Sequence, residues 1–436
     1  MASRSFAPSG PLTGTLPTAP DKSISHRAAL LAAMAVGTST VEGYLLGEDT
    51  LSTLRVLEQL GAGIRREGST VEITGMGLRG AAETSEVLDV GNSGTLMRLV
   101  SGWLSGQAGR SWQLDGDRSI RSRPMGRIAV PLGQMGAEFE LSDGRPPFLL
   151  KGASLSGINW ISDVASAQVK SAILLAGLLA DGPSSVTESP TSRDHTERML
   201  IEQGADLTRQ RLQDGSTRVE IKPADDLASV DRSIPGDPSS AAFLVLAAVL
   251  VEGSEITVSG VNLNPERTGF FRLLAKMGAD ISGYEAPPED FGRISKEPVG
   301  DVSARSSSLV GITVGAEEIP AAVDEITLLA LAGCFASGTT RVSGAGELKV
   351  KETDRIAGVV QLISALGGTI EATEDGFVVT GTGDLRGGTI DSLGDHRLAM
   401  LGAVAGLASE QGVTVTDFGA ADVSYPGFIA DISRLA

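Results

Sequence analysis

A repeated segment constrains the fold of this chain more than any other feature of its sequence. Each copy has a polar turn, an apolar helix, a glycine turn into a strand, a second helix and a closing strand. In the first copy the helices are expected over about 21–35 and 50–60. The turn glycines recur about every 70 to 85 residues, at Gly37, Gly109, Gly182, Gly253, Gly338 and Gly412. That spacing is the length of one supersecondary unit, so the sequence predicts six copies in a mixed α/β fold.

Proline and glycine cluster at 234–238, which predicts a boundary between two halves of the chain with three copies each. We expect one domain over residues 20–235 and a second over 236–436, with residues 1–19 free to join the second domain as a strand. No glycine-rich fingerprint follows a strand and the copies number six, so neither a dinucleotide-binding fold nor an eight-fold barrel is expected. Residues 286–308, rich in Pro, Ser and charge, are interpreted as an inserted loop.

The formal net charge of −18 argues against a nucleic-acid partner, because such binding normally requires a basic face. The single cysteine, Cys334, lies in an apolar run and is interpreted as a core residue. The longest apolar run, 241–251, is too short to span a bilayer, and residues 1–14 lack the apolar core of a signal peptide. We therefore expect a cytoplasmic protein that binds neither a membrane nor nucleic acid. A monomer is also expected.

Every repeated apolar helix is preceded by polar residues that suit a helix start. The six starts are Asp21-Lys22-Ser23, Gly91-Asn92-Ser93-Gly94-Thr95, Ser166-Ala167-Gln168, Asp237-Pro238-Ser239-Ser240, Asp324-Glu325 and Asp395-His396-Arg397. Helix capping explains their Ser, Asp and Asn residues without any ligand. Capping does not explain the cations near these starts. The positive end of a helix dipole repels a cation, so its placement there is unfavourable without an anion close by. These cations are Lys22, Arg27, Arg98, Lys170 and Arg397. Capping alone and a site for a multiply anionic ligand are both open at this point.

Basic clusters also open the second helix of three copies. They are Arg118-Ser119-Ile120-Arg121-Ser122-Arg123-Pro124, Ser192-Arg193-Asp194-His195 and Lys349-Val350-Lys351-Glu352-Thr353-Asp354-Arg355. Arginine binds carboxylate or phosphate with two parallel hydrogen bonds and keeps its charge, so several converging arginines would hold an acid rigidly. Ion pairing within the protein is the alternative, especially for Glu352.

Six motifs, distributed over both halves of the chain, carry a resemblance to a known family. They are Pro20-Asp21-Lys22-Ser23-Ile24-Ser25-His26-Arg27, Gly91-Asn92-Ser93-Gly94-Thr95, Arg121-Ser122-Arg123-Pro124, Ser166-Ala167-Gln168, Lys351-Glu352-Thr353-Asp354-Arg355 and Asp395-His396-Arg397. In this order they resemble the motifs of the 5-enolpyruvylshikimate-3-phosphate (EPSP) synthase family. The resemblance implies a two-lobed inside-out α/β barrel, with three βαβαββ repeats in each lobe and the active site in the interdomain cleft.

The resemblance also implies a reaction of the shikimate pathway to aromatic amino acids. The enolpyruvyl group of phosphoenolpyruvate would be transferred to the 5-hydroxyl of shikimate 3-phosphate, with release of phosphate. Such an addition and elimination needs an acid and a base. The implied catalytic residues are Asp324 as acceptor of the hydroxyl proton, Glu352 or Lys22 as donor to carbon, and His396 in support. No cofactor or metal is expected, because arginines neutralise the charge and three scattered histidines make a poor ligand set.

Both implied substrates are anions, and the matching residues are largely basic or polar. Those implied for shikimate 3-phosphate are Lys22, Ser23, Arg27, Ser166, Gln168 and Lys351, with Arg193 as a further candidate. Those implied for phosphoenolpyruvate are Lys22, Gly94, Arg123, Gln168, Arg355 and Arg397. Asn92, Thr95 and Ala167 belong to the same motifs and complete the candidate substrate-binding set.

Some positions depart from the family or bear on inhibition. Ala167 stands where some members have a second serine, which places one substrate hydrogen bond in doubt. The segment Val423-Ser424-Tyr425-Pro426 lacks a lysine that many members carry there, and with it a phosphoenolpyruvate contact. A glycine at the place of Gly94 leaves room for glyphosate in the family, so we expect a glyphosate-sensitive enzyme, although Leu99 beside the motif could loosen that sensitivity.

Three other functions are weighed against this one. The sister enolpyruvyl transferase that acts on UDP-N-acetylglucosamine shares the fold, but it normally uses a loop cysteine and an asparagine after the lysine, where this chain has Ser23 after Lys22. An RNA 3′-phosphate cyclase would need a basic RNA surface, which the net charge opposes. A catalytically silent anion-binding protein is disfavoured because Asp324 and Glu352 are both in place.

Overall fold

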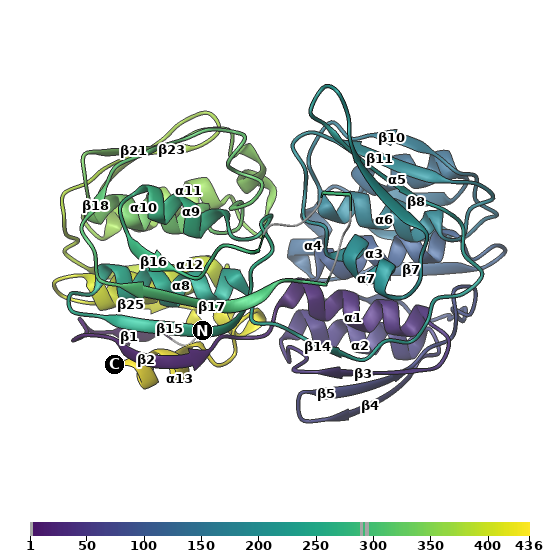
Figure 1. Ribbon diagram of the computed structural model, residues 1–436, viewed down its shortest axis with the longest axis horizontal. Helices are drawn as coiled ribbons and strands as arrows, with labels where there is room; N and C mark the ends of the chain where they lie inside the picture. The colour runs from purple at the N-terminus through teal and green to yellow at the C-terminus, as the bar shows by residue number, and fades with distance from the viewer. Residues whose placement is uncertain (1–2, 288–290, 293–295) are drawn as a thin grey trace. The chain divides into compact units, whose positions relative to one another are not determined.

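The computed structural model describes residues 3–287, 291–292 and 296–436, and Figure 1 labels their helices and strands. Contacts between residues divide the chain into two compact units. The N-terminal unit comprises Pro20–Ile234 and Pro288–Glu297, and the C-terminal unit comprises Met1–Ala19, Pro235–Pro287 and Pro298–Ala436. None of the helices in the described ranges is both long and apolar enough to cross a membrane.

Three four-stranded sheets form the β structure of the N-terminal unit. In sheet order the first has β14 (Arg232–Ser233), β3 (Thr38–Glu42), β5 (Thr70–Thr74) and β4 (Gly63–Glu67); the second has β6 (Leu88–Asp89), β7 (Ser111–Asp115), β9 (Arg145–Lys151) and β8 (Glu138–Ser142); the third has β10 (Asn159–Ile161), β11 (Ser184–Glu188), β13 (Thr217–Ile221) and β12 (Leu207–Arg211). In each sheet the second strand pairs parallel with the first and antiparallel with the third.

The same strand order recurs twice in the C-terminal unit. One sheet has β2 (Thr13–Pro17), β15 (Glu255–Asn262), β17 (Val299–Arg305) and β16 (Asp280–Ser282), and another has β19 (Thr313–Val314), β21 (Thr339–Val342), β23 (Phe377–Thr380) and β22 (Thr369–Ala372). Smaller sheets pair β24 (Gly388–Asp391), β25 (Val413–Thr416) and β1 (Arg4–Phe6), and β18 (Leu309–Val310) with β20 (Ala336–Ser337). Residues Arg4–Phe6 and Thr13–Pro17 therefore supply two strands to this unit.

The expected loop over 286–308 is wrong in its second half. Residues Val299–Arg305 form β17, the antiparallel partner of β15. Only the small side chains of Val302 and Ala304 are buried along this strand. The alternation of apolar and polar residues is therefore weak, and the segment was interpreted as a loop. The part of the expected loop at 288–290 and 293–295 lies outside the described residues.

Thirteen α-helices are present in the described residues. Those of the N-terminal unit are α1 (Lys22–Met34), α2 (Glu48–Gln59), α3 (Gly94–Ser105), α4 (Arg118–Ser122), α5 (Gly126–Met135), α6 (Ala167–Gly177) and α7 (His195–Glu202). Those of the C-terminal unit are α8 (Pro238–Leu250), α9 (Gly269–Lys276), α10 (Ile326–Phe335), α11 (Arg355–Ala365), α12 (His396–Ala408) and α13 (Phe428–Leu435), with short 3₁₀ helices η1 (Gly346–Val350) and η2 (Phe418–Val423). The two helices expected in the first copy are confirmed to within two residues.

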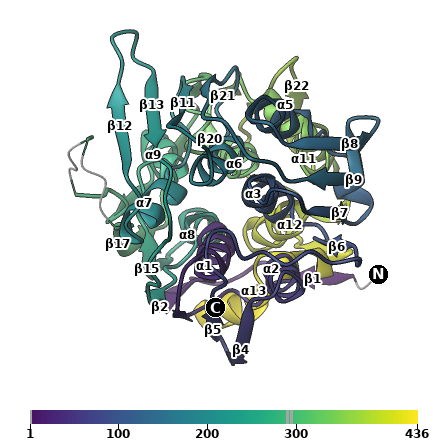
Figure 2. The same cartoon turned by 90° about the vertical axis from the view of Figure 1, so that its right-hand side faces the viewer.

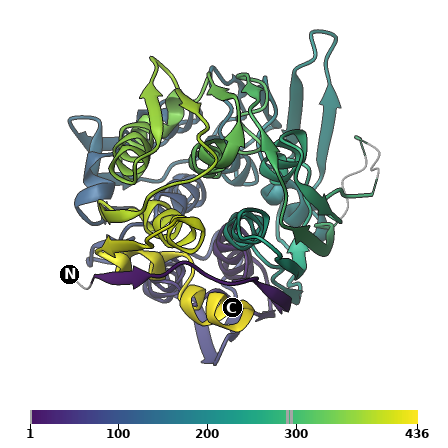
Figure 3. The same cartoon turned by 90° about the vertical axis from the view of Figure 1, so that its left-hand side faces the viewer.

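The apolar helices form the cores of the two units. Helices α1, α3 and α6 are seen nearly end on in Figure 2, and helices of the C-terminal unit are seen in the same way in Figure 3. Every residue from Ile24 to Met34 of α1 is buried, and so is every residue from His396 to Leu407 of α12. A helix that is covered on all sides needs apolar residues all round, which is why these segments show little amphipathic pattern.

Small residues allow two of these helices to pack closely. A Cβ atom on Gly102 of α3 would lie 2.4 Å from the carbonyl oxygen of Ala172 in α6, which is far inside van der Waals contact. The absence of a side chain at Gly102 therefore sets the separation of α3 and α6. Because the starts of both helices carry candidate site residues, this contact also helps to position the site.

We expect Gly102→Ala to destabilise the protein by about 1–3 kcal/mol, because the added methyl forces α3 away from α6. Urea denaturation measures the change. Gly133→Ala is the matched control, since a Cβ on this glycine of α5 meets no atom within 4 Å. The control should be neutral or slightly stabilising. Equal stability of Gly102→Ala and the wild-type protein would contradict the packing argument.

Candidate active site

Polar side chains cap the helices that carry the expected site residues of the N-terminal unit. The carboxylate of Asp21 accepts a hydrogen bond from the backbone N of Ile24 at 2.9 Å. Ser93 and Ser166 cap α3 and α6 in the same way, through the N–H group three residues later. Capping is therefore confirmed at these starts. It does not exclude anion binding, because one cap satisfies only one of the four N–H groups that a helix start leaves without an intrahelical partner.

Lys22, the first residue of α1, is held by a carboxylate from the next helix. Its Nζ lies 3.1 Å from Oδ2 of Asp49 in α2. The Lys22 side chain keeps 18% of its surface exposed, whereas that of Asp49 keeps 6%. The ammonium is thus oriented by a buried partner and still open to a ligand. Sequence reasoning missed Asp49, whose only signal was its place in the first turn of α2.

Arg27, one turn further along α1, is buried and ties three helices together. Its Nε donates to Thr196 Oγ1 at 2.8 Å and its Nη2 to Ser171 Oγ at 3.2 Å. Burial lowers the pKa of Arg27 to about 10, against the opposing effect of Glu197. The guanidinium therefore stays charged at neutral pH. Its Nη1 also donates to the carbonyl of Ser23, the second residue of α1, at 3.0 Å.

The starts of α3 and α6 lie against each other and share hydrogen bonds. Nε2 of Gln168 donates to Oγ1 of Thr95 at 2.9 Å, and Arg98 donates to the amide oxygen of the same glutamine. Arg123 donates to Oδ1 of Asn92 at 3.2 Å. The structure therefore brings Asn92, Thr95, Arg123 and Gln168 together, as the motifs implied. Arg98, which was not among the candidate substrate ligands, belongs to the same group.

Lys170 and Arg193 have different roles although both were noted as cations. Lys170 is 1% exposed, and its Nζ lies 3.1 Å from Glu188 and 2.8 Å from Glu197. Ion pairing within the protein is therefore the correct interpretation of Lys170. Arg193 is partly exposed in the turn before α7, and its charge lies near enough to Arg27 to lower the pKa of that guanidinium, behind the larger effect of burial.

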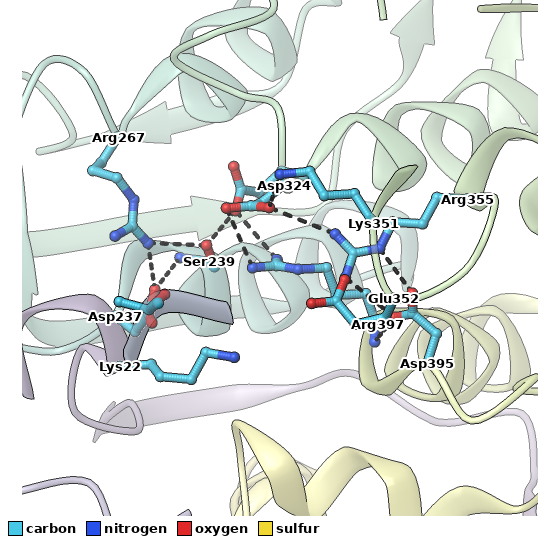
Figure 4. A network of polar contacts seen from close by, with 12 residues as sticks. Lys22, Asp237, Ser239, Arg267, Asp324, Lys351, Glu352, Arg355, Asp395 and Arg397 are labelled. Carbon is cyan, nitrogen blue, oxygen red and sulfur yellow. Dashed lines mark hydrogen bonds and ion pairs between the residues drawn. The ribbon is translucent and has the colours of Figure 1, made fainter. Parts of the chain in front are cut away.

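The carboxylate of Asp324 is the centre of the expected site residues in the C-terminal unit (Figure 4). Its Oδ1 lies 3.5 Å from Nη1 of Arg355 and 3.7 Å from Nζ of Lys351. Its Oδ2 lies 3.7 Å from Nη2 of Arg397. Three cations, two of them from the cluster before and at the start of α11 and one from the start of α12, thus surround one carboxylate. The side chain of Asp324 remains 15% exposed, so a ligand can reach it.

Arg355 is fixed more rigidly than its neighbours. Its Nε lies 2.8 Å from Asp395 and its Nη2 lies 2.6 Å from Glu352. Burial alone would lower the pKa of Arg355, but Asp395, Glu352 and Asp324 outweigh it and raise that pKa. Burial likewise opposes the charge of Asp395, and Arg355 overcomes it and lowers the pKa of this carboxyl group. Both partners are therefore charged at neutral pH.

The remaining candidates lie at helix starts. Ala167 is the first residue of α6. His396 is the first residue of α12 and is buried beside Asp395, whose side chain caps that helix by accepting from the N–H of Arg397 at 2.9 Å. The described residues contain no group of three His, Cys, Asp or Glu side chains placed to hold a metal ion. Fixed cations at helix starts, with carboxylates among them, suit the binding and proton transfer of anionic substrates.

These features define an enzyme that acts on anionic small molecules, and comparison with known proteins names its family. A sequence model described as EPSP synthase (3-phosphoshikimate 1-carboxyvinyltransferase) matches residues 6–432. Proteins named 3-phosphoshikimate 1-carboxyvinyltransferase from Geobacter sulfurreducens and Gloeobacter violaceus are 43% and 46% identical over 438 and 434 residues. The alignments cover 100% of both chains in the first case, and 99% of this chain and 98% of the relative in the second.

A solved structure of EPSP synthase from Acinetobacter baumannii is similar in fold. It superposes with a TM-score of 0.84 at 37% identity, covering 99% of this chain and 98% of that one. The chain therefore belongs to the EPSP synthase family, and the family expected from the motifs is confirmed. It is a transferase of the shikimate pathway.

The cysteine argues further against the sister transferase. Cys334 lies within α10, buried, and its Sγ is 3.2 Å from the carbonyl oxygen of Ala330. Burial raises the pKa of this thiol to about 12, so it is neither exposed nor ionised as a nucleophile would be. The interpretation of Cys334 as a core residue is confirmed.

Gly94 is expected to control inhibition by glyphosate. A Cβ atom there would lie 2.9 Å from Nη1 of Arg123 and 3.0 Å from Nη1 of Arg98, so both guanidinium groups would have to move. We expect the wild-type enzyme to be sensitive and Gly94→Ala to raise the glyphosate inhibition constant about tenfold or more, with weaker phosphoenolpyruvate binding. Inhibition kinetics test this, with Gly126→Ala as control because a Cβ on that glycine meets no atom within 4 Å. Equal inhibition constants for Gly94→Ala and wild type would disprove it.

His26 in α1 should make the stability of the protein depend on pH. Its Nδ1 lies 2.6 Å from Thr53 Oγ1, and burial, with Lys22 and Arg27, lowers its pKa well below 6.5. The unfolded chain binds a proton below about pH 6.5 that the folded protein does not, so acidification favours unfolding.

The free energy of unfolding should fall by up to roughly 1.4 kcal/mol per pH unit below that point through this residue. Denaturation of wild type and His26→Asn from pH 7.5 to 5 gives the free energy of unfolding at each pH. The effect of His26 is the difference between the two proteins in the slope of this free energy against pH. Identical slopes would show that His26 does not contribute.

Proposed function

We propose that the residues at these helix starts catalyse transfer of the enolpyruvyl group of phosphoenolpyruvate to the 5-hydroxyl of shikimate 3-phosphate. The observation that carries this assignment is the environment of Asp324, with Lys351, Arg355 and Arg397 each within 4 Å of its carboxylate. A deprotonated carboxylate at this place can accept the proton of a substrate hydroxyl. The cations around it suit the phosphate and carboxylate groups of the substrates.

We further propose that the fold is a two-lobed inside-out barrel of six βαβαββ repeats. The strand order that recurs in all five four-stranded sheets of the described residues supports this proposal, with the three-stranded sheet of β24, β25 and β1 as the sixth copy. Three copies would fall in each lobe, with the lobes corresponding to 20–235 and to 1–19 plus 236–436.

The substrate assignments follow the motifs residue by residue. Shikimate 3-phosphate would be held by Lys22, Ser23, Arg27, Ser166, Gln168, Arg193 and Lys351. Phosphoenolpyruvate would be held by Lys22, Gly94, Arg123, Gln168, Arg355 and Arg397, with Asn92 before α3 and Thr95 in its first turn as further contacts. Ala167 would contribute only backbone groups. These residues come from both units, and their action on one pair of substrates is part of the proposal.

The chemistry can be written as an addition followed by an elimination. Asp324 would take the proton of the 5-hydroxyl as the hydroxyl oxygen bonds to C2 of phosphoenolpyruvate. At the same time Glu352 or Lys22 would give a proton to C3. The residue that gave this proton is then deprotonated, and it would take a proton back from C3, which re-forms the double bond as the C2–O bond to phosphate breaks. The arginines would stabilise the departing phosphate, and His396 would support the carboxylates from the start of α12.

The direct test is the release of phosphate from phosphoenolpyruvate. The protein should release phosphate with shikimate 3-phosphate as acceptor and not with UDP-N-acetylglucosamine. Turnover with the second acceptor alone would assign the chain to the sister activity, and no turnover with either would leave it an anion-binding protein.

Lys22 gives the sharpest test of a single residue. We expect Lys22→Ala to lose about a hundredfold or more in turnover, because the variant lacks both a substrate contact and a candidate proton donor. Thermal denaturation should show that it remains folded. Lys222→Ala is the matched control, since this lysine is exposed and pairs with Asp206 on the surface. Near-normal turnover of Lys22→Ala would remove Lys22 from the site.

The proposal includes no cofactor, no metal and no nucleic-acid partner, and a monomer in the cytoplasm. The net charge of −18 supports the absence of a nucleic-acid partner, because polyanions bind basic surfaces.

A further inference from the structure

The arginines at the starts of α11 and α12 are anchored differently. Arg355 is 1% exposed and has a carboxylate oxygen of Asp395 at 2.8 Å and one of Glu352 at 2.6 Å. The contacts of Arg397 are longer, with Asp324 at 3.7 Å and Glu325 at 3.4 Å. Asp324 is assigned to the proton of the substrate hydroxyl, so it is poorly suited to act as a fixed anchor as well. Glu325 has no such assignment.

Glu325 is placed to serve as that anchor. It is the N-cap residue of α10 and is 1% exposed, so its backbone and side chain are both held. Its Oε1 is shared between Nη1 of Arg397 and the hydroxyl of Ser239 from α8. A carboxylate in this position can fix the direction of the guanidinium while Asp324 remains available to the substrate.

A second arginine fixes the direction of these hydrogen bonds. Nη2 of Arg267 lies 3.0 Å from Oγ of Ser239 and 2.7 Å from Oδ1 of Asp237 (Figure 4). Arginine can only donate, so Ser239 accepts from Arg267 and gives its own proton to Glu325. The N–H of Ser239 in turn donates to Asp237 at 2.8 Å, which ties the network to the start of α8. The network thus runs from Arg267 through Ser239 and Glu325 to Arg397.

We propose that Glu325 is a positioning residue for phosphoenolpyruvate binding. The hydrogen bond that it accepts from Ser239 fixes its carboxylate, and the carboxylate in turn orients Arg397. The inference rests on the proposed assignment of Arg397 to phosphoenolpyruvate. Glu325 is the buried carboxylate partner of Arg397, as Asp395 is of Arg355. Its contact is longer, at 3.4 Å instead of 2.8 Å, and uses one oxygen that Ser239 shares. Removing its charge therefore loosens Arg397 without removing any group that contacts a substrate.

Steady-state kinetics with Glu325→Gln test this inference. We expect the KM for phosphoenolpyruvate to rise about tenfold, the size expected when a hydrogen bond to a charged group loses that charge. The KM for shikimate 3-phosphate should stay within about twofold, and the melting temperature should stay close to that of wild type, because Gln keeps the shape and one acceptor. Ser239→Ala should act in the same direction with a smaller effect, and it preserves the test should Glu325→Gln fail to fold.

Glu318→Gln is the matched control, because this glutamate lies in the same unit and its pair with Lys276 is on the surface. It should leave both KM values unchanged. A double-mutant cycle adds a second criterion: Glu325→Gln should have little further effect on phosphoenolpyruvate once Arg397 is replaced by Lys, since the two act as one unit.

The outcomes separate the inference from the function on which it rests. Absence of wild-type turnover with shikimate 3-phosphate would overturn the proposed function. Normal phosphoenolpyruvate affinity of Arg397→Lys would overturn the assignment of that arginine. The role of Glu325 is tested once the wild-type protein turns over shikimate 3-phosphate and Arg397→Lys weakens phosphoenolpyruvate binding. An unchanged KM for phosphoenolpyruvate in Glu325→Gln and Ser239→Ala, or full additivity in the cycle, would then overturn that role.

Discussion

Buried cations in this protein keep their charge because carboxylates lie against them. Arg355 is the clearest case, since burial opposes its charge and three carboxylates outweigh that effect. Lys170 is likewise placed between two carboxylates, 3.1 Å from Glu188 and 2.8 Å from Glu197. Removing one partner from such a pair typically costs about 3–5 kcal/mol, because it leaves a buried charge uncompensated. The helices whose starts carry these groups are therefore fixed by the same interactions that arrange the candidate site.

Exposure separates the cations that hold the fold from those that can meet a ligand. The side chain of Lys170 is 1% exposed, whereas those of Lys22 and Lys351 are 18% and 29% exposed. Arg397 is intermediate, at 10%. Arg355 is the exception among the residues assigned to phosphoenolpyruvate, because it is as buried as Lys170. A ligand that reaches Arg355 must displace one of its carboxylates, and Asp324 is the one that lies farthest from the guanidinium, at 3.5 Å.

Features encoded locally were predictable from the sequence, and contacts between distant segments were not. Polar residues before apolar runs predicted the helix starts. The resemblance to the family implied a common site for Asp324, Glu352 and Arg397, and this shared role stays a prediction. The partner of Lys22 was missed because Asp49 is 27 residues away and reads only as an acidic residue in a first turn. Glu325 was named only as part of a helix start, because its link to Ser239 spans 86 residues. Strand β17 was read as a loop because its buried residues are small.

The assignment of the two substrates to these helix starts is tested most directly by a crystal structure of the complex with shikimate 3-phosphate and a non-reacting analogue of phosphoenolpyruvate. The assignment predicts anionic groups in contact with Lys22, Arg27 and Lys351, the 5-hydroxyl beside Asp324, and a second acid against Arg397. Ligand density at the exposed arginines of α4, with the helix starts empty, would contradict it.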